Sequence, residues 1–312
     1  MASYRGGLPQ LSGQVFLADA GIETDLIFNH GIDIPHFAAH LLLEDDRGRK
    51  ALEDYFRAFL ELAREVGTGF ILDSQTWKAH PHWAAALGAS PTELRDANQR
   101  SIAFIAELRS RYASSCKAIV LNGIIGPCGD AYAPDGELAI EDAEAYHSTQ
   151  IGWLADTEVD MITATTFTQA NEAAGFVRAA RQAALPVVVS FTVGTDGRLP
   201  SGQSLDDAIL SVDRATQSAA AYFMVNCAHP DHFFHALQDS AAARRIRGIR
   251  CNASRKSHAE LDQSTQLDDG DPVELGSQYR ALVRTMPWLN VFGGCCGSDL
   301  RHVTEIARAL AA

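Results

Sequence analysis

The stretch Ala118–Ile119–Val120–Leu121–Asn122 is a short, continuous apolar run that ends on a polar residue. Apolar residues at successive positions are typical of a strand covered on both faces, as in a parallel sheet whose crossovers are helices. The run around Val187, Val188 and Val189 repeats this pattern. Along the chain, such runs predict eight strands, at Val15–Ala18, Gly69–Asp73, Ala118–Asn122, Asp160–Thr165, Pro186–Phe191, Tyr222–Asn226, Gly248–Cys251 and Leu289–Phe292.

The segments between these runs have the periodicity of amphipathic helices. Leu52, Tyr55, Phe56 and Phe59, for example, fall on one helical stripe. Several of these segments also carry signals for a helix start. Their predicted N-terminal caps are Ser90, which forms a capping box with Glu93, and Asp271, Ser204 and Ser298.

Alternating strands and helices over the whole chain indicate an α/β protein. Because no Pro/Gly/Ser-rich linker interrupts the alternation, we expect residues 1–312 to form a single (β/α)8 TIM barrel. The alternative is an open doubly wound sheet, which usually has a GxGxxG loop after its first strand, whereas this chain has DAGIE at residues 19–23. The long segment Thr24–Asp46 and the polar segment Arg255–Gly270 are predicted to lie over the mouth of the barrel.

Composition narrows the class of partners. The chain has 312 residues, of which 46% are hydrophobic, and a formal net charge of −13. This charge repels nucleic acid and anionic membranes, so we expect neither as a partner. No segment has the apolar core of a signal peptide or the roughly 18 apolar residues of a membrane span, which predicts a cytoplasmic protein.

The cysteines are the candidate reactive residues. Six cysteines are too few for a disulfide scaffold, and three of them follow predicted strands: Cys227 after the sixth, Cys295 and Cys296 after the eighth. At the mouth of a barrel these three thiolates can meet around one zinc ion and leave its fourth position open. The alternative is that they are small buried apolar residues, which is our prediction for Cys116 and Cys251; Cys128 fits either description.

A zinc ion bound by three thiolates is electron-rich and therefore a poor activator of water. A thiol that enters the open position instead loses its proton and becomes a reactive thiolate at neutral pH. The three cysteines therefore favour alkyl transfer onto sulfur over hydrolysis.

These motifs resemble those of the zinc-dependent homocysteine S-methyltransferases, which include the betaine–homocysteine and S-methylmethionine–homocysteine methyltransferases. The resemblance covers nearly the whole chain and is most specific at Val225–Asn226–Cys227 followed by Gly293–Gly294–Cys295–Cys296–Gly297. It implies a metal-binding and catalytic role for Cys227, Cys295 and Cys296, with zinc as cofactor and the acceptor sulfur as fourth ligand. It also implies methyl transfer to homocysteine and a place in methionine biosynthesis.

The resemblance further implies substrate-binding residues. Asp19 matches an acidic residue that holds the amino group of the acceptor, and Ser74 falls near the carboxylate of the acceptor. Where the family places a second acid after the fourth strand, this chain has Thr165, so either Glu23 compensates or the acceptor is a thiol other than homocysteine. The full predicted set is Asp19, Ala20, Gly21, Glu23, Ser74, Trp77, Thr165 and Asn226.

One barrel leaves no room for a corrinoid or folate domain, so the predicted donor is a small methyl-onium compound. Candidates are S-methylmethionine, S-adenosylmethionine and a betaine-type molecule. Aromatic faces attract such cations. Aromatic residues predicted on the rim segments are Phe28, Phe37, Trp77 and Phe167.

Two other functions compete with methyl transfer. A barrel metallohydrolase would use acids and histidines of the rim, although surface positions are the simpler expectation for these histidines. The second competitor is a structural zinc barrel that binds a thiol without turnover. The histidines concerned are His30, His36, His40, His80 and His82. The sequence does not indicate the oligomeric state.

Overall fold

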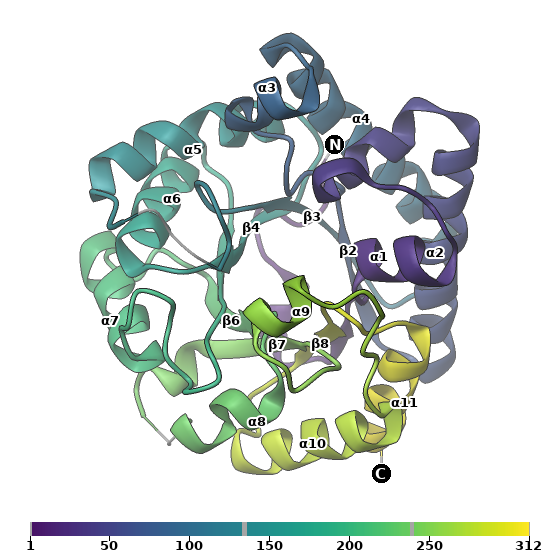
Figure 1. Ribbon diagram of the computed structural model, residues 1–312, viewed down its shortest axis with the longest axis vertical. Helices are drawn as coiled ribbons and strands as arrows, with labels where there is room; N and C mark the ends of the chain where they lie inside the picture. The colour runs from purple at the N-terminus through teal and green to yellow at the C-terminus, as the bar shows by residue number, and fades with distance from the viewer. Residues whose placement is uncertain (1, 133–135, 238–239, 312) are drawn as a thin grey trace.

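A computed structural model describes residues 2–132, 136–237 and 240–311 of the chain. Eight parallel strands form a closed barrel in which each strand pairs with the next in sequence and β8 pairs with β1. Figure 1 looks down this barrel. The strands are β1 (Phe16–Leu17), β2 (Gly69–Asp73), β3 (Ile119–Ile125), β4 (Met161–Phe167), β5 (Val187–Phe191), β6 (Tyr222–Asn226), β7 (Ile246–Cys251) and β8 (Val291–Gly294). The predicted (β/α)8 barrel is therefore confirmed.

Strand bounds are where prediction and structure differ most. β3 continues three residues beyond Asn122, because Asn122 and Gly123 pair with β4 although neither has a strand-forming side chain. β8 begins and ends two residues later than predicted. Gly293 and Gly294 pair with β7, and a Cβ on Gly293 would lie 2.7 Å from the carbonyl oxygen of Asp19. A Cβ on Gly294 would overlap the Ser298 hydroxyl, so neither glycine of β8 has room for a side chain.

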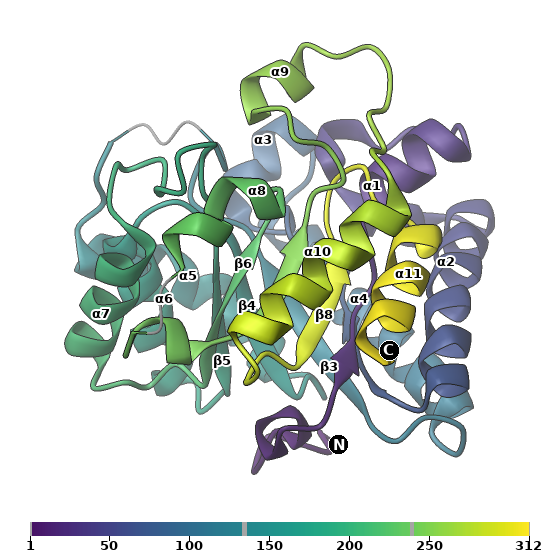
Figure 2. The ribbon, with the colours of Figure 1, turned by 90° about the horizontal axis from the view of Figure 1, so that it is seen from below.

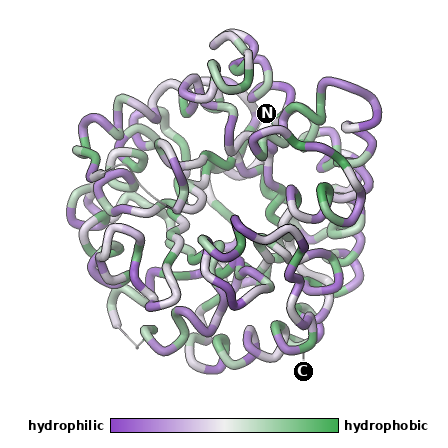
Figure 3. The backbone as a smooth tube through the Cα atoms, in the orientation of Figure 1, coloured by the Kyte–Doolittle hydropathy of each residue, from purple (hydrophilic) through white to green (hydrophobic). Residues whose placement is uncertain are grey.

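Helices surround the barrel as an outer ring. Their colours alternate between hydrophilic and hydrophobic along the tube in Figure 3, as expected when one face of each helix packs on the strands. The predicted stripe of Leu52, Tyr55, Phe56 and Phe59 is fully buried. The helices are α1 (Ile22–Thr24), α2 (Asp46–Val66), α3 (Ala84–Leu87), α4 (Pro91–Tyr112), α5 (Ile140–Ala155), α6 (Ala170–Gln182), α7 (Leu205–Thr216), α8 (Pro230–Phe233), α9 (His258–Asp262), α10 (Pro272–Thr285) and α11 (Leu300–Ala311).

Three of the four predicted caps are confirmed. Ser90 forms the capping box with Glu93, and the side chains of Ser204 and Asp271 accept hydrogen bonds from the first turns of α7 and α10. Ser298 is not a cap, because its hydroxyl donates to the carbonyl of Cys295 at 2.7 Å. Asp299 takes that role at α11, where its carboxylate accepts from the amide of Arg301 at 2.9 Å.

Long segments cover one end of the barrel and the N-terminal residues cover the other. Segment 24–46 and α9 stand above the carboxyl ends of the strands, while the N-terminus lies at the opposite end (Figure 2). There the buried amide of Gln10 donates to the hydroxyl of Tyr222 at 3.2 Å. None of the described helices is both long and apolar enough to cross a membrane.

Substitution of two helical glycines tests how closely the helices of the outer ring pack. A Cβ on Gly276 of α10 would lie 2.8 Å from the carbonyl oxygen of Glu305 on α11, whereas a Cβ on Gly152 of α5 would have no neighbour within 4 Å. We expect Gly276→Ala to destabilise the protein by about 1–3 kcal/mol, because α10 and α11 must move apart. Gly152→Ala is its control and should stabilise by up to about 1 kcal/mol. Denaturant unfolding of both variants measures this, and equal effects would contradict the packing described.

Candidate active site

A cavity of about 540 Å³ opens at the carboxyl ends of the strands. Residues from all eight strand–loop units contribute to its wall, so the barrel itself positions the site. All members of the predicted metal-binding and acceptor-binding sets line it: Asp19, Ala20, Gly21, Glu23, Ser74, Trp77, Thr165, Asn226, Cys227, Cys295 and Cys296.

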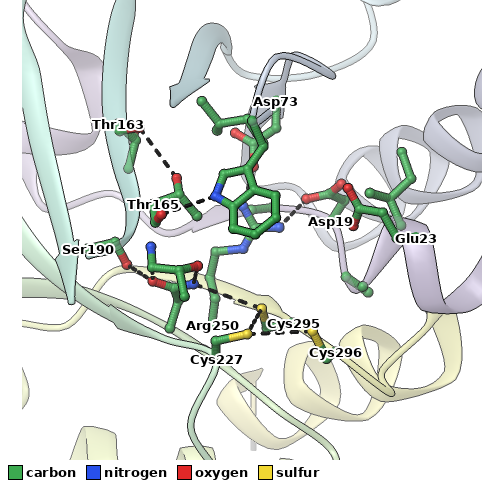
Figure 4. A pocket seen from close by; sticks show the side chains of 18 of the residues that line it. Asp19, Glu23, Asp73, Thr163, Thr165, Ser190, Cys227, Arg250, Cys295 and Cys296 are labelled. Atoms are coloured by element: carbon green, nitrogen blue, oxygen red, sulfur yellow. Dashed lines mark hydrogen bonds and ion pairs between the residues drawn. The ribbon is translucent and has the colours of Figure 1, made fainter. Parts of the chain in front are cut away.

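The thiols of Cys227, Cys295 and Cys296 form a cluster in this wall. The Sγ atom of Cys227 lies 3.0 Å from that of Cys295 and 3.5 Å from that of Cys296. Figure 4 shows the three sulfur atoms turned toward one another. Among the described residues, these cysteines are the group of His, Cys, Asp and Glu side chains that can hold a metal ion, since their sulfurs all lie within 4.8 Å of one another.

The cluster fits a zinc ion closely. Zn–S bonds of about 2.3 Å in a tetrahedron require sulfurs about 3.8 Å apart, so the two distances from the Cys227 sulfur need to lengthen by less than about 1 Å. The backbone of Cys227 has a φ of 57°, a left-handed conformation that is unusual for a residue with a side chain. The residue with this conformation is the one whose sulfur lies near both other sulfurs, a feature that no sequence pattern indicated.

Neighbouring groups bias the protonation of the cluster. A hydrogen bond from Cys227, with further help from Cys296 and from the Arg250 charge, lowers the pKa of the Cys295 thiol well below its usual value. The hydroxyl of Tyr132 lies 3.1 Å from the Cys227 sulfur, and its ring stacks on His258 at 3.9 Å between centroids. Tyr132 and His258 line the cavity although sequence reasoning did not select them, because Tyr132 lies on a loop, His258 begins the short helix α9, and neither belongs to a motif.

Arg250 is the main residue that the sequence reasoning missed. It lies on β7, with its guanidinium inside the barrel, where Nη2 donates to Asp19, Nη1 donates to Asp73, and Nε donates to the carbonyl of Gly294 at 3.1 Å. A signal was present, since an arginine within an otherwise apolar strand of a barrel needs a buried acid as partner. The predicted strand ends Asp19 and Asp73 supply two.

The charge of Arg250 only partly offsets the effect of burial on the carboxyl groups near it. Burial raises the pKa of Asp19 to about 7 against the lowering effect of Arg250, and the Asp73 charge raises it further. Burial likewise raises the pKa of Glu23 to about 7. Thr165 brings no charge, and its carbonyl accepts from the Trp77 indole at 3.1 Å. The cavity therefore has carboxyl groups poised to ionise next to a cation.

Asn226 secures the strands beside the cluster. Its Oδ1 accepts from the Ser190 hydroxyl at 2.6 Å and from the Thr166 amide at 3.1 Å, and its Nδ2 donates to the Thr166 hydroxyl at 2.8 Å. Thr166 has a φ of 66°, which is strained for a β-branched residue. Asn226 thus holds an irregular turn of β4 against β6, next to Cys227.

The aromatic residues of the rim divide into two groups. Phe28, Phe37 and Trp77 line the cavity, and the two phenylalanines are about half exposed. The Lys78 ammonium already lies 4.8 Å from the Trp77 ring centroid. Phe167 was wrongly predicted on the rim, because it is the last residue of β4 and its ring packs against Phe176 at 5.4 Å in the outer layer.

None of the five rim histidines lines the cavity. The surface prediction holds for His30, His36 and His82, but His40 and His80 are buried. His80 stacks on Tyr146 at 3.8 Å between centroids, and burial lowers its pKa to about 4. Because none of the five histidines reaches the cavity, they do not form the metal site that a hydrolase would need there.

The remaining cysteines also lie outside the cavity wall. Cys116 and Cys251 are buried as predicted, and Cys128 is half-buried. Cys251 lies in β7 with its side chain fully covered, and Cys116 packs between α4 and β3, where its thiol donates to the carbonyl of Leu60 at 3.6 Å. Both therefore serve packing.

The fold and the site define a closed parallel (β/α)8 barrel with a three-cysteine cluster at its carboxyl mouth. Residues 16–310 match the family model of homocysteine S-methyltransferase, and the chain belongs to that family of enzymes. The resemblance drawn from the sequence motifs is thereby confirmed.

Solved structures with the same fold include the homocysteine methyltransferase MmuM from Escherichia coli. Its oxidized form shares 16% identity with this chain at a TM-score of 0.70, covering 94% of this chain and 95% of that one. Its metallated form shares 17% identity at a TM-score of 0.70, covering 96% and 99%. Its apo form shares 17% identity at a TM-score of 0.63, covering 95% and 96%.

Metal content tests the cysteine cluster directly. We expect the purified protein to retain one zinc ion after loading and desalting, and Cys296→Ala to retain none, because two thiolates leave the ion too weakly held. Cys116→Ala is the matched control, since its thiol lies outside the cavity, and it should retain the ion. Elemental analysis by mass spectrometry gives the stoichiometry, and a full zinc equivalent in Cys296→Ala would rule out this site.

Proposed function

We propose that this protein is a zinc-dependent S-methyltransferase that moves a methyl group from a small onium donor to a thiol, with homocysteine as acceptor and methionine as product. The observation that carries the proposal is the cluster of Cys227, Cys295 and Cys296 in the wall of a cavity large enough for two small substrates. Membership of the homocysteine S-methyltransferase family supports it.

The residues around the cluster suit an acceptor thiol. Cys227, Cys295 and Cys296 would hold the zinc, which when bound supplies the positive charge that lets an acceptor thiol lose its proton at neutral pH. Asp19 and Glu23 lie in the same cavity with pKa values raised to about 7. An ammonium group on the acceptor would favour their ionised forms and be held by them.

The mouth of the cavity suits a cationic donor. Phe28 and Phe37 offer aromatic faces there, and Asp262 of α9 adds a carboxylate to the same wall. Because the faces of aromatic rings attract cations by about 0.5–2 kcal/mol each, a sulfonium or quaternary ammonium is the donor group that this wall favours. S-methylmethionine, S-adenosylmethionine and betaine-type donors all carry such a group.

The chemistry is a direct displacement. The acceptor thiolate attacks the methyl carbon in line with the leaving group, and a sulfur–carbon bond forms. The bond between the methyl carbon and the onium centre breaks, and its electron pair leaves with a neutral thioether or amine. The task of the protein is to align the two substrates in the cavity, whose walls are formed by the carboxyl ends of the strands and by α9.

The competing functions find less support. A hydrolase would need nitrogen or oxygen ligands on its metal, and the rim histidines point elsewhere. A structural zinc barrel would not require an open cavity with aromatic and carboxylate walls beside its metal. Formation of methionine would distinguish methyl transfer from both of these functions.

The decisive experiment incubates the zinc-loaded protein with homocysteine and, in turn, S-methylmethionine, S-adenosylmethionine, betaine and dimethylsulfoniopropionate. We expect methionine from at least one donor, detected by mass spectrometry. Cys296→Ala should lose at least 100-fold in rate, because the acceptor thiol then keeps its proton. Cys116→Ala should match the unmodified protein. Methionine formation by the metal-free protein or by Cys296→Ala at an unchanged rate would refute the zinc-dependent mechanism, and no product from any donor would refute the activity.

A further inference from the structure

Several hydroxyl groups in the cavity wall are already engaged with neighbouring polar groups. Ser74 is the residue expected near the acceptor carboxylate, and its hydroxyl lies 2.7 Å from that of Thr76. The single hydroxyl proton of Thr76 goes to the carbonyl of Ile124 at 2.6 Å, so Ser74 must be the donor between the two hydroxyls. Ser74 therefore has no proton left for a substrate carboxylate.

The hydroxyls of Ser190 and Thr163 are engaged in the same way. The hydroxyl of Ser190 donates to Asn226 at 2.6 Å, and that of Thr163 donates to Asn122 at 2.8 Å. The amide of Asn122 in turn donates to Asp73 at 2.7 Å. The hydroxyls of Ser74, Ser190 and Thr163 therefore have no proton left for a negatively charged group in this part of the cavity.

Arg250 is the positively charged group of the wall. Among the described residues that line the cavity it is the one lysine or arginine, and burial lowers the pKa of the nearby His258 to about 4, which leaves that histidine neutral at pH 7. A guanidinium has five N–H groups, and three of those on Arg250 donate to Asp19, Asp73 and Gly294. Two N–H groups remain, on a side chain that is 15% exposed and faces the cavity.

The two acids fix this guanidinium beside the cysteine cluster. Asp19, which follows β1, and Asp73, which ends β2, accept from its two Nη atoms. Gly294, whose carbonyl accepts from Nε, is the residue before Cys295. In Figure 4 Arg250 reaches from beside the sulfur atoms toward Asp19. The Arg250 guanidinium and the Asp19 carboxyl group thus lie side by side, and Arg250 bonds the residue next to the proposed metal ligand Cys295.

This pair matches the headgroup of an amino acid. An α-amino acid in neutral water carries an ammonium and a carboxylate on the same carbon, and in homocysteine two methylene groups separate that carbon from the sulfur. With the sulfur at the cysteine cluster, the headgroup falls in the region where Asp19 and Arg250 lie. The ammonium then meets Asp19, and the carboxylate meets the fork of Arg250, the geometry that a guanidinium binds most strongly.

We propose that Arg250, held in place by Asp19 and Asp73, determines the specificity for the acceptor by binding its carboxylate, so that the acceptor is a zwitterionic thiol amino acid. This inference rests on the proposed function for the identity of the thiol as acceptor. Asp73 is a positioning residue in this scheme, since it acts through Arg250.

The test compares three thiols of equal chain length: homocysteine, 3-aminopropane-1-thiol, which lacks the carboxylate, and 4-mercaptobutanoate, which lacks the amine. Calorimetry on the zinc-loaded protein without donor measures their Kd values. We expect 3-aminopropane-1-thiol to bind roughly 10- to 100-fold more weakly than homocysteine, the loss typical of a charge-assisted contact. Equal Kd values for these two thiols in the unmodified protein would overturn the proposal without any variant.

Variants then assign the effect to Arg250. In Arg250→Gln the two Kd values should converge to within about threefold, and Arg250→Lys, which keeps the charge but loses the fork, should restore only part of the preference. Arg247→Gln is the matched control, because Arg247 lies on the same strand but does not line the cavity, and it should leave the preference unchanged. If circular dichroism shows that Arg250→Gln does not fold, Arg250→Lys and the comparison of thiols decide.

A further experiment tests whether Arg250 binds the carboxylate of the acceptor or a carboxylate on the donor. S-methylmethionine carries a carboxylate, and trimethylsulfonium does not. If Arg250→Gln raises the KM for S-methylmethionine and leaves the acceptor preference intact, Arg250 serves the donor and the proposal is overturned. Because Kd is measured without donor, a protein that binds homocysteine selectively but methylates nothing would refute the proposed function while supporting the role of Arg250.

Discussion

The pairing of β7 with both of its neighbours is the constraint on which the site depends. Cys227 follows β6, and its amide donates to the carbonyl of Arg250 at 3.1 Å. Cys295 follows β8, and its amide donates to the carbonyl of Cys251 at 2.9 Å. Two adjacent residues of one strand thus hold the backbones of two cysteines that are 68 positions apart. Backbone hydrogen bonds, which do not depend on side chains, bring the thiols together.

The same strand contributes the charge of the site. Arg250 presents its carbonyl to Cys227 and its guanidinium to Asp19 and Asp73, so that one residue links the cysteine cluster to the carboxylates. Burial raises the pKa of Asp19 despite its ion pair with Arg250, and the negative charge of Asp73 raises it further. A cavity that holds one arginine and two acids favours ligands that carry a positive group as well as a negative one.

Strained backbone occurs where the site requires it. Cys227 and Thr166 both have positive φ angles, and both lie at the carboxyl ends of strands that face the cavity. Asn226 is the side chain that stabilises this region, since it bonds Thr166 and Ser190 and lies next to Cys227 in the chain. Such conformations cost about 1–3 kcal/mol each and persist only where surrounding contacts enforce them.

The sequence alone determined the alternation of strands and helices, and therefore the barrel, because apolar periodicity follows directly from which faces are buried. It also determined that Cys227, Cys295 and Cys296 lie at one end of the barrel, because parallel strands all end on the same side. Only the tertiary structure decided which polar groups pair across the cavity: Arg250 with Asp19 and Asp73, and Ser74 with Thr76. These contacts join residues from different strands, and their geometry depends on barrel closure, twist and side-chain rotamers, none of which leaves a periodic trace in the chain.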